Sequence, residues 1–205
     1  MKMRLCILAL VGLLFSGCAT LPSKDYTEFR KHQPRSILVL LPLNNSTEVI
    51  AGYSVLTTTT RPLSELGYYV YPVAMVDQFL KENGLPGAAE MHQAPLDKLH
   101  QVFGADAVLY ITVEKYGSKY LVIANNTFVD VRAKLVDCRT GTLLWENKVV
   151  AQGGGNSGMV EALVGQVMSK LADQAHVVAA QASAMLLSDP KQGLLKGSRH
   201  PEFGR

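Results

Sequence analysis

The sequence predicts an α/β (α+β) domain in which a mixed sheet of about five strands is flanked by helices and followed by a long C-terminal helix. Short, continuously apolar runs at 36–43, 67–73 and 105–116 are typical of strands buried on both faces. Segments with helical spacing connect these runs, as crossover helices connect parallel strands. Two later strands, 128–136 and 142–152, flank a turn that contains glycine, which indicates an antiparallel hairpin.

The helices between the strands are predicted from apolar residues that recur every three or four positions. The first covers 48–66, where Pro62 should kink the helix or break it into two pieces. Two shorter helices follow at 74–83 and 95–103, separated by a loop at 85–93. A glycine follows each of the shorter helices and is the expected stop signal.

The chain is expected to double back after the apolar run that ends at residue 116. Gly117-Ser118 is a turn signal, and residues 119–125 would form the returning strand. The polar residues 125–127 indicate a bulge or a separate turn. The last hairpin should turn at 137–141, where an aspartate bonds to its own turn and a glycine supplies positive φ.

The closing helix, predicted at 159–187, would be about 29 residues and roughly 43 Å long. Met168 and Leu171 lie on its long apolar stripes. One interpretation is a helix packed wholly within its own domain. The other is an interface that buries surplus apolar surface in a homodimer or larger oligomer. The polar segment 188–205 is expected to be disordered.

The N-terminus carries the parts of a secretory signal. Lys2 and Arg4 precede an apolar run at 5–15, and small residues follow that run. The run is too short for a transmembrane helix, which needs about 20 apolar residues. Residues 1–17 are therefore predicted to be a signal peptide that is removed from the mature protein.

The end of this signal resembles the bacterial lipobox. Leu14-Phe15-Ser16-Gly17-Cys18 has the spacing of that motif, with Phe15 where leucine is usual. The resemblance implies that Cys18 is alkylated by a diacylglycerol and that, after cleavage, its new amine is acylated, typically with palmitate. A plain secretory signal with an incidental cysteine is the alternative. By resemblance to enterobacterial sorting, the non-acidic Ala19 favours the outer membrane.

Composition restricts the partners and the domain organisation. The net charge is +3, and loss of Lys2 and Arg4 leaves 18 basic and 17 acidic residues, which gives no sign of nucleic-acid binding. The polar segment 18–35 is predicted to be the lipidated N-terminus and a tether. Residues 36–187 are predicted to form one periplasm-facing domain with a sizeable core.

Four polar residues follow the first strand, at the place where an α/β sheet often binds its ligand. These residues are Asn44, Asn45, Ser46 and Thr47. Because a helix comes next, its backbone N–H groups could hold an anion there. The favoured alternative is an ordinary loop with a helix cap, since the glycine-rich pattern of phosphate-binding loops is absent from the sequence.

The sequence offers little support for catalysis or metal binding. Cys138 is the one thiol left after removal of the signal and lipidation of Cys18, so no internal disulfide is expected. It lies in a predicted turn, without a base and an orienting group beside it, and we expect it to be dispensable. The five histidines lack metal-binding spacing, so neither a metal nor another cofactor is expected.

Four segments together resemble one family of bacterial lipoproteins. They are residues 36–46, 62–73, 103–110 and 139–145, with the sequences SILVLLPLNNS, PLSELGYYVYPV, FGADAVLY and RTGTLLW. The family is known as domain of unknown function seven-nine-nine, and a neisserial surface antigen is its known representative. The resemblance extends from about residue 34 to about residue 187. More distantly, the segments are similar to the curli-secretion lipoprotein and to the N-terminal domain of the Tol-system propeller protein.

The resemblance implies a setting without implying a reaction. Relatives are periplasm-facing α/β domains of envelope assemblies, and auxiliary roles beside secretion channels or transporters are suggested for them. The leading hypothesis is therefore a lipid-anchored, non-enzymatic component of an envelope assembly, secretion or transport complex. A periplasmic module for a small ligand is the first alternative. A hydrolase is the least favoured, because no nucleophile, base and orienting group occur together.

Overall fold

The computed structural model describes residues 24–121, 124–153 and 174–204, and the side chains of 118–126 are not described. The predicted signal peptide and Cys18 lie outside these ranges. So does the first part of the predicted closing helix, including Met168 and Leu171. Residues 174–187 are helical, as predicted. The interface predicted at Met168 and Leu171 stays a prediction.

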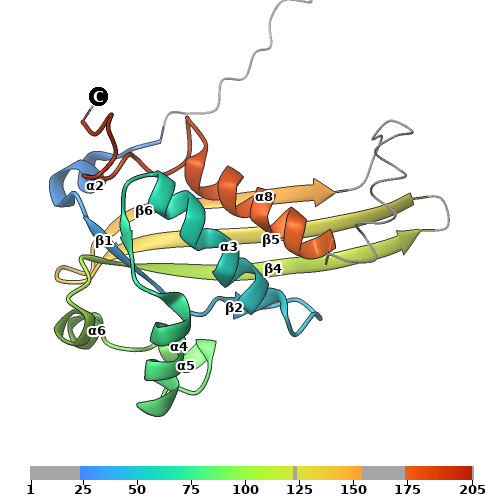
Figure 1. Ribbon diagram of the computed structural model, residues 1–205, viewed down its shortest axis with the longest axis horizontal. Helices are drawn as coiled ribbons and strands as arrows, with labels where there is room; N and C mark the ends of the chain where they lie inside the picture. The colour runs from blue at the N-terminus through green and yellow to red at the C-terminus, as the bar shows by residue number, and fades with distance from the viewer. Residues whose placement is uncertain (1–23, 122–123, 154–173, 205) are drawn as a thin grey trace, which may run out of the picture.

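The sheet is mixed and has six strands in the order β3-β1-β4-β5-β6, with β2 also paired to β4 (Figure 1). The strands are β1 Ser36–Val39, β2 Leu43–Asn44, β3 Tyr69–Val70, β4 Ala107–Leu121, β5 Ala124–Asp137 and β6 Leu143–Gly153. Pairs β1–β3, β1–β4 and β2–β4 are parallel, and the pairs among β4, β5 and β6 are antiparallel. The predicted mixed sheet flanked by helices is confirmed.

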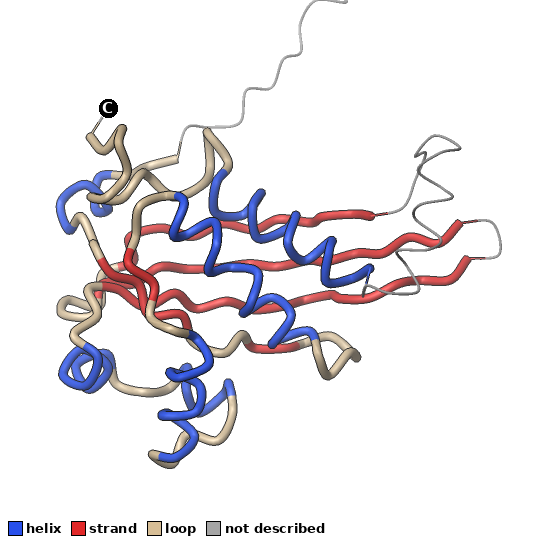
Figure 2. Tube along the Cα trace, viewed as in Figure 1, coloured by secondary structure: helices blue, strands red, loops and turns tan. Residues whose placement is uncertain are grey.

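Two helices lie side by side over one face of the long strands (Figures 1 and 2). They are α3 Ala51–Glu65 and α8 Gln174–Ser188. The other described helices are α2 Thr27–His32, α4 Val73–Glu82, α5 Ala88–His92 and α6 Leu96–Phe103. Helix α3 continues through Pro62 to Glu65, so the predicted break is absent from it. The predicted loop at 85–93 contains α5, because burial of Met91 holds that segment against the core.

The core fills the space between the sheet and these two helices. Leu109, Ile111 and Leu135 of the sheet are fully buried, as are Val55 of α3 and Leu186 of α8. Full burial of an aliphatic side chain of this size contributes about 1.5–3 kcal/mol. Side chains along a strand point alternately to the two faces of the sheet. The residues between those that fill this core therefore lie on the opposite face.

Strand β4 does not turn at Gly117-Ser118, so that prediction is wrong. The strand continues to Leu121, and Gly117 pairs with Phe128 of β5. The irregularity comes earlier, where the register shifts between Val113 and Lys115. This bulge reverses the alternation of the strand, so Tyr116 faces the helices. A Gly-Ser pair favours a turn through its own backbone preferences alone. Here the pairing of β4 with β5 outweighs those preferences.

Both ends of the described chain belong to the domain. Phe29 of α2 is buried, in a segment predicted to be a free tether. The predicted disorder after Ser188 is also wrong, because Leu194 is buried and the backbone N–H of Gly197 donates to the carbonyl of Leu66 at 2.7 Å. A Cβ on Gly197 would lie 2.8 Å from the Gly67 oxygen, so this close approach requires glycine. Polar composition suggested disorder, but long-range contacts order the segment.

Candidate functional site

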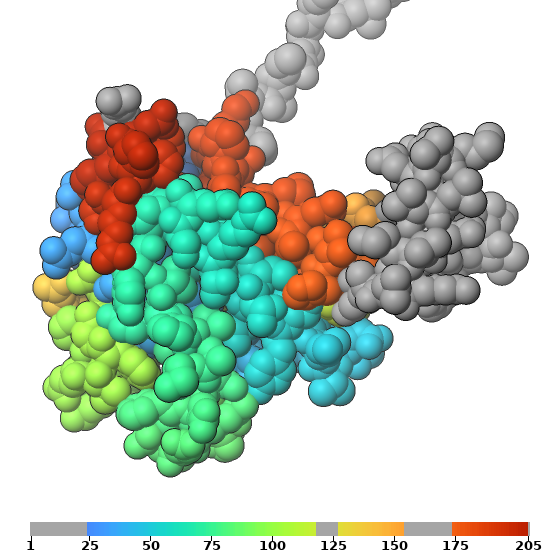
Figure 3. Space-filling view, viewed as in Figure 1, coloured from blue at the N-terminus to red at the C-terminus, as the bar shows by residue number. Residues whose placement is uncertain are grey.

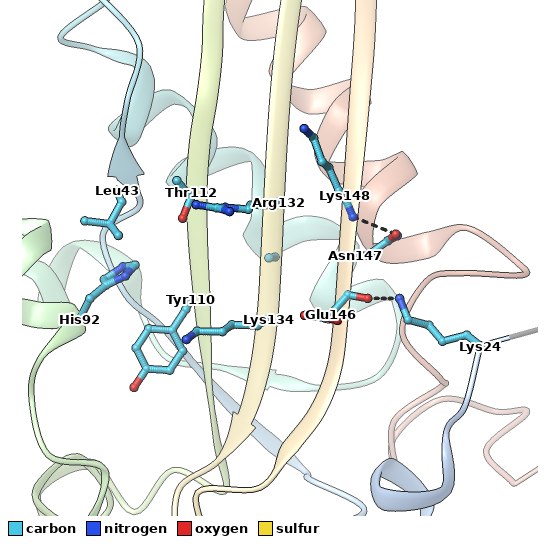
Figure 4. Close-up of a pocket in the computed structure, with 11 residues that line it drawn as sticks. Lys24, Leu43, His92, Tyr110, Thr112, Arg132, Lys134, Glu146, Asn147 and Lys148 are labelled. Atoms are coloured by element: carbon cyan, nitrogen blue, oxygen red, sulfur yellow. Dashed lines mark hydrogen bonds between the residues drawn. The ribbon is translucent and has the colours of Figure 1, made fainter.

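The face of the sheet opposite α3 and α8 carries a hollow of about 720 Å³ (Figure 4). We call this side of β4, β5 and β6 the outer sheet face. The residues around its hollow are mostly polar or charged. They are Lys24, Leu43, His92, Tyr110, Thr112, Arg132, Ala133, Lys134, Glu146, Asn147 and Lys148. The side chains of Arg132 and Lys148 are each 59% exposed, so this face is open to solvent at its centre.

Strand register places like charges side by side on the outer sheet face. Arg132 lies directly opposite Lys148, an arrangement that destabilises a sheet unless other charges offset it. Glu114 at the bulge accepts from Arg132 at 2.9 Å, and Asp130 accepts from Lys148 at 3.3 Å. Lys134 has a different neighbour, because its Nζ lies 5.1 Å from the centre of a tyrosine ring, that of Tyr110. The charges therefore form a surface network that is positive at its centre.

Asp130 is the least exposed charged group of this network. Its side chain is 9% exposed, and Lys148 contacts only Oδ2. Within the described part of the chain, Asp130 Oδ1 has no hydrogen-bond partner. An unsatisfied buried acceptor costs about 1–3 kcal/mol, so this oxygen lowers the stability of the network.

His92 and Tyr110 form the aromatic side of the hollow. Their rings lie 5.2 Å apart, edge to face, and the His92 Nε2–H donates to the carbonyl of Leu41 at 3.0 Å. Burial lowers the pKa of His92, and the hydrogen bond to Leu41 offsets this only partly. Burial also raises the pKa of Tyr110 to about 12. Both groups are therefore uncharged at neutral pH, and the hollow offers lysine and arginine cations beside an aromatic wall.

The sequence-predicted ligand loop does not line this hollow. Asn44 Nδ2 donates to the Glu48 carbonyl at 2.8 Å, and the Ser46 hydroxyl donates to Asn44 Oδ1 at 2.7 Å. Asn45 Nδ2 donates to Glu114 at 2.9 Å, which ties the loop to the bulge of β4. Thr47 lies in the same exposed loop. These contacts are those of a loop that satisfies its own polar groups, and ligand binding there stays a prediction.

The structure brings together a hydroxyl and an imidazole that sequence reasoning did not connect. Ser54 of α3 lies 2.7 Å from His176 Nδ1 of α8, and the Tyr116 hydroxyl donates to Ser54 Oγ at 2.7 Å. Ser54 and His176 are 122 residues apart, so no local motif could have revealed them. Ser54 is buried, and a second bond joins Thr58 to Ser183 at 2.8 Å. We interpret both bonds as polar contacts that align α3 with α8.

Cys138 is buried, and its surroundings make the thiol unreactive. Its backbone N–H donates to the Asp106 carbonyl at 2.9 Å, and its side chain belongs to the core. Burial, followed by the neighbouring carboxylates of Asp137 and Asp106, raises the pKa of the thiol to about 12. Because the thiolate is the reactive form, Cys138 is a poor nucleophile at neutral pH.

We expect iodoacetamide to leave Cys138 unmodified in the folded chain at neutral pH and to modify it after unfolding in guanidinium chloride. The thiol is both protonated and shielded in the fold. Mass spectrometry of the chain from residue 18, with Cys18→Ser so that one thiol remains, measures the reaction. Rapid modification without denaturant would mean that the thiol is accessible, and the nucleophile hypothesis would have to be reopened.

The described residues form neither a metal-binding cluster nor a membrane-spanning helix. No group of three or more His, Cys, Asp or Glu side chains in them is arranged to hold a metal ion. Within the same ranges, none of the helices combines the length and the apolar character needed to cross a bilayer.

The chain is similar to known lipoproteins. A family model described as "Putative lipoprotein GNA1162-like" matches residues 24–199. A protein described as "Putative lipoprotein NMB1124/NMB1162" from Neisseria meningitidis serogroup B is 43% identical over 207 residues, which are 96% of each chain. The crystal structure of lipoprotein GNA1162 from Neisseria meningitidis is 45% identical, with a TM-score of 0.57, and covers 68% of this chain and 99% of that chain.

A more distant solved structure shares the fold. The PelC dodecamer from Paraburkholderia phytofirmans is 19% identical, with a TM-score of 0.51. The match covers 79% of this chain and 90% of that chain.

Proposed function

The chain belongs to the family of GNA1162-like lipoproteins, and from this membership we propose that it is a lipid-anchored, periplasm-facing, non-enzymatic component of an envelope assembly, secretion or transport complex. The proposed anchor is Cys18, in the outer membrane. The described domain begins at Lys24, only six residues later. The domain is thus held next to the membrane, where it meets other envelope proteins.

The observation that carries this proposal is the outer sheet face. One face of the sheet is covered by α3 and α8, whereas the other exposes a charged network across three long strands. Protein interfaces combine such charge patterns with polar groups that find partners across the contact. Arg132 and Lys148 are groups of this kind, because each side chain is 59% exposed on this face.

A second copy of the chain is one candidate for this contact. The PelC fold, seen at 19% identity, assembles as a dodecamer, which supports the idea that this architecture can self-associate. The outer sheet face carries both cations and carboxylates, so two copies could pair a cation of one with a carboxylate of the other. We therefore propose a homodimer or larger oligomer, with a different envelope protein as the other candidate.

A photo-crosslinking amino acid at Val150 tests the proposal in intact cells. Val150 lies on β6, faces outward beside Asp130 and is 49% exposed. We expect a specific covalent product of higher mass, identified by mass spectrometry as a second copy or as another envelope protein. Val177 is the matched control, because it is also a valine, is 50% exposed and lies on α8 over the opposite face.

The products distinguish the hypotheses. A specific product from Val150 and none from Val177 supports an assembly through the outer sheet face. Equal products from both positions would show random collision, and the absence of any protein product from Val150 would count against the assembly proposal. In that case the hollow between Tyr110 and Lys148 favours the alternative, a periplasmic module for a small anionic ligand.

A further inference from the structure

Charge is distributed unevenly along this nearly neutral chain. Residues 24–35 and 188–204 carry seven basic and four acidic side chains, whereas residues 36–187 carry ten basic and thirteen acidic ones. The two terminal segments are therefore net positive, and the rest of the domain is net negative. Such an asymmetry has a physical consequence only if the basic side chains gather on one surface.

The two terminal segments do lie together. The Tyr26 hydroxyl donates to the Gly193 carbonyl, and Lys24 Nζ lies 3.4 Å from the Gln192 carbonyl. Figure 3 shows the C-terminal segment, in red, packed beside the blue N-terminal segment at one end of the molecule. We call this part, residues 24–35 with 188–204, the anchored end.

Basic side chains surround the hollows of the anchored end. Arg30 and Lys196 line one hollow, and Arg35 and Arg199 line a neighbouring one. Some of these charges are offset, since Lys196 pairs with Glu202 and Arg35 lies 3.9 Å from Asp106. Arg30 and Lys191 take part in none of the described ion pairs, although Arg30 still interacts electrostatically with the Asp25 carboxylate. Both side chains are exposed to solvent.

The length of the preceding chain places this surface close to the membrane. Five residues lie between Cys18 and Lys24, and the six extended steps from one to the other span about 20 Å. If Cys18 carries lipid, Lys24 cannot move farther than this from the bilayer surface. Figure 1 shows β4, β5 and β6 running from the anchored end toward the far end of the molecule. The strands would then extend away from the membrane.

We propose that the anchored end binds the phosphate headgroups of anionic lipids in the membrane that holds the chain. This inference rests on the proposed lipid anchor and adds a second attachment to it. Each lysine or arginine near an anionic bilayer strengthens binding roughly fivefold, and the attraction falls off within a Debye length. Phe203, 41% exposed at the same hollow as Arg30, adds an apolar ring that can insert at the boundary between headgroups and acyl chains. Together the two attachments orient the domain with its outer sheet face accessible from the periplasm.

Vesicle binding without the lipid anchor tests this proposal. The chain from residue 18 with Cys18→Ser retains every described residue. We expect it to co-sediment with phosphatidylcholine vesicles that contain phosphatidylglycerol, to bind pure phosphatidylcholine much more weakly, and to dissociate as salt is added. Arg30→Gln combined with Lys191→Gln should weaken binding by about 25-fold, at roughly fivefold for each charge.

The matched control removes two charges elsewhere. Lys98→Gln with Lys115→Gln changes exposed lysines of α6 and β4 and should leave binding nearly unchanged. Thermal melting checks that both double variants are folded. Equal losses in the two double variants, or no preference for phosphatidylglycerol, would overturn the proposal. Fatty-acid labelling of the native chain in cells tests the anchor at Cys18 separately. If Cys18 is labelled but the Cys18→Ser chain does not bind these vesicles, only this inference is refuted. If Cys18 is not labelled but the Cys18→Ser chain binds them, only the anchor is refuted.

Discussion

Cys18→Ser is expected to release nearly all of the protein from the membrane fraction. The predicted anchor consists of several acyl chains, and each buried CH₂ group contributes about 0.8 kcal/mol to membrane binding. The basic anchored end supplies a much weaker and salt-sensitive attraction, so the substituted chain should be washed off membranes at high salt. Metabolic labelling with a fatty acid and fractionation of the cells measure the two effects.

Cys138→Ser is the control for that experiment, because it replaces the other cysteine of the mature chain. It should keep both the label and the membrane location. Label that persists after Cys18→Ser would contradict the lipidation of Cys18. Loss of label with unchanged membrane attachment at high salt would point to a second anchor.

Asp106→Ala is expected to lower the free energy of unfolding by about 3 kcal/mol, since it leaves several hydrogen-bond donors without their acceptor. Asp106 Oδ2 accepts from the backbone N–H groups of Arg35 and Ser36 at 2.9 and 3.2 Å, and Oδ1 accepts from Arg139 at 3.0 Å. The carboxylate thus joins the start of β1, the start of β4 and the β5–β6 turn.

Thermal melting of the chain from residue 18 measures this loss, which corresponds to a decrease in Tm of about 6–12 °C for a domain of this size. Asp97→Ala is the control, because Asp97 is an exposed aspartate in the first turn of α6. Its removal should cost less than about 1 kcal/mol, the usual contribution of an acidic residue at a helix N-terminus. Equal shifts in the two variants would contradict the role assigned to Asp106.

The same carboxylate should make stability depend on pH. Burial alone would raise the pKa of Asp106, but the hydrogen bonds from Arg35 and Ser36 outweigh burial and hold it below the ordinary value of 3.8. A lowered pKa in the folded state means that the stabilisation is present above pH 3.8 and is lost as pH falls through the folded-state pKa. The stability difference between the native chain and Asp106→Asn should therefore shrink on acidification below that value.

Several elements could be predicted because their causes are local. The β5–β6 turn follows from Asp137, whose Oδ1 accepts from the backbone of Arg139 and Thr140, and from Gly141 at φ +70°. Continuous apolar runs indicated the parallel strands, and Gly104 ended α6 in the left-handed conformation that glycine favours.

Other features depended on contacts between distant parts of the chain. The C-terminal segment has a polar composition, yet Leu194 is buried and the Trp145 indole donates to the Gln192 carbonyl at 2.9 Å. The continuation of β4 past Gly117 depends on its pairing with β5. The charge pattern of the outer sheet face likewise depends on the register of three strands. The ion pair of Arg132 with Glu114 and that of Lys148 with Asp130 each join two different strands.

The sequence by itself determined the class of the fold, the last hairpin and the motif at Cys18, each encoded in a few neighbouring residues. Tertiary structure decided where the domain begins and ends, which face of the sheet stays open and which charges meet on it. The physical reason is that hydrophobic periodicity and turn chemistry act over a few residues. The burial of Leu194, and the contact of Ser54 with His176 122 residues away, are decided only when the whole chain packs.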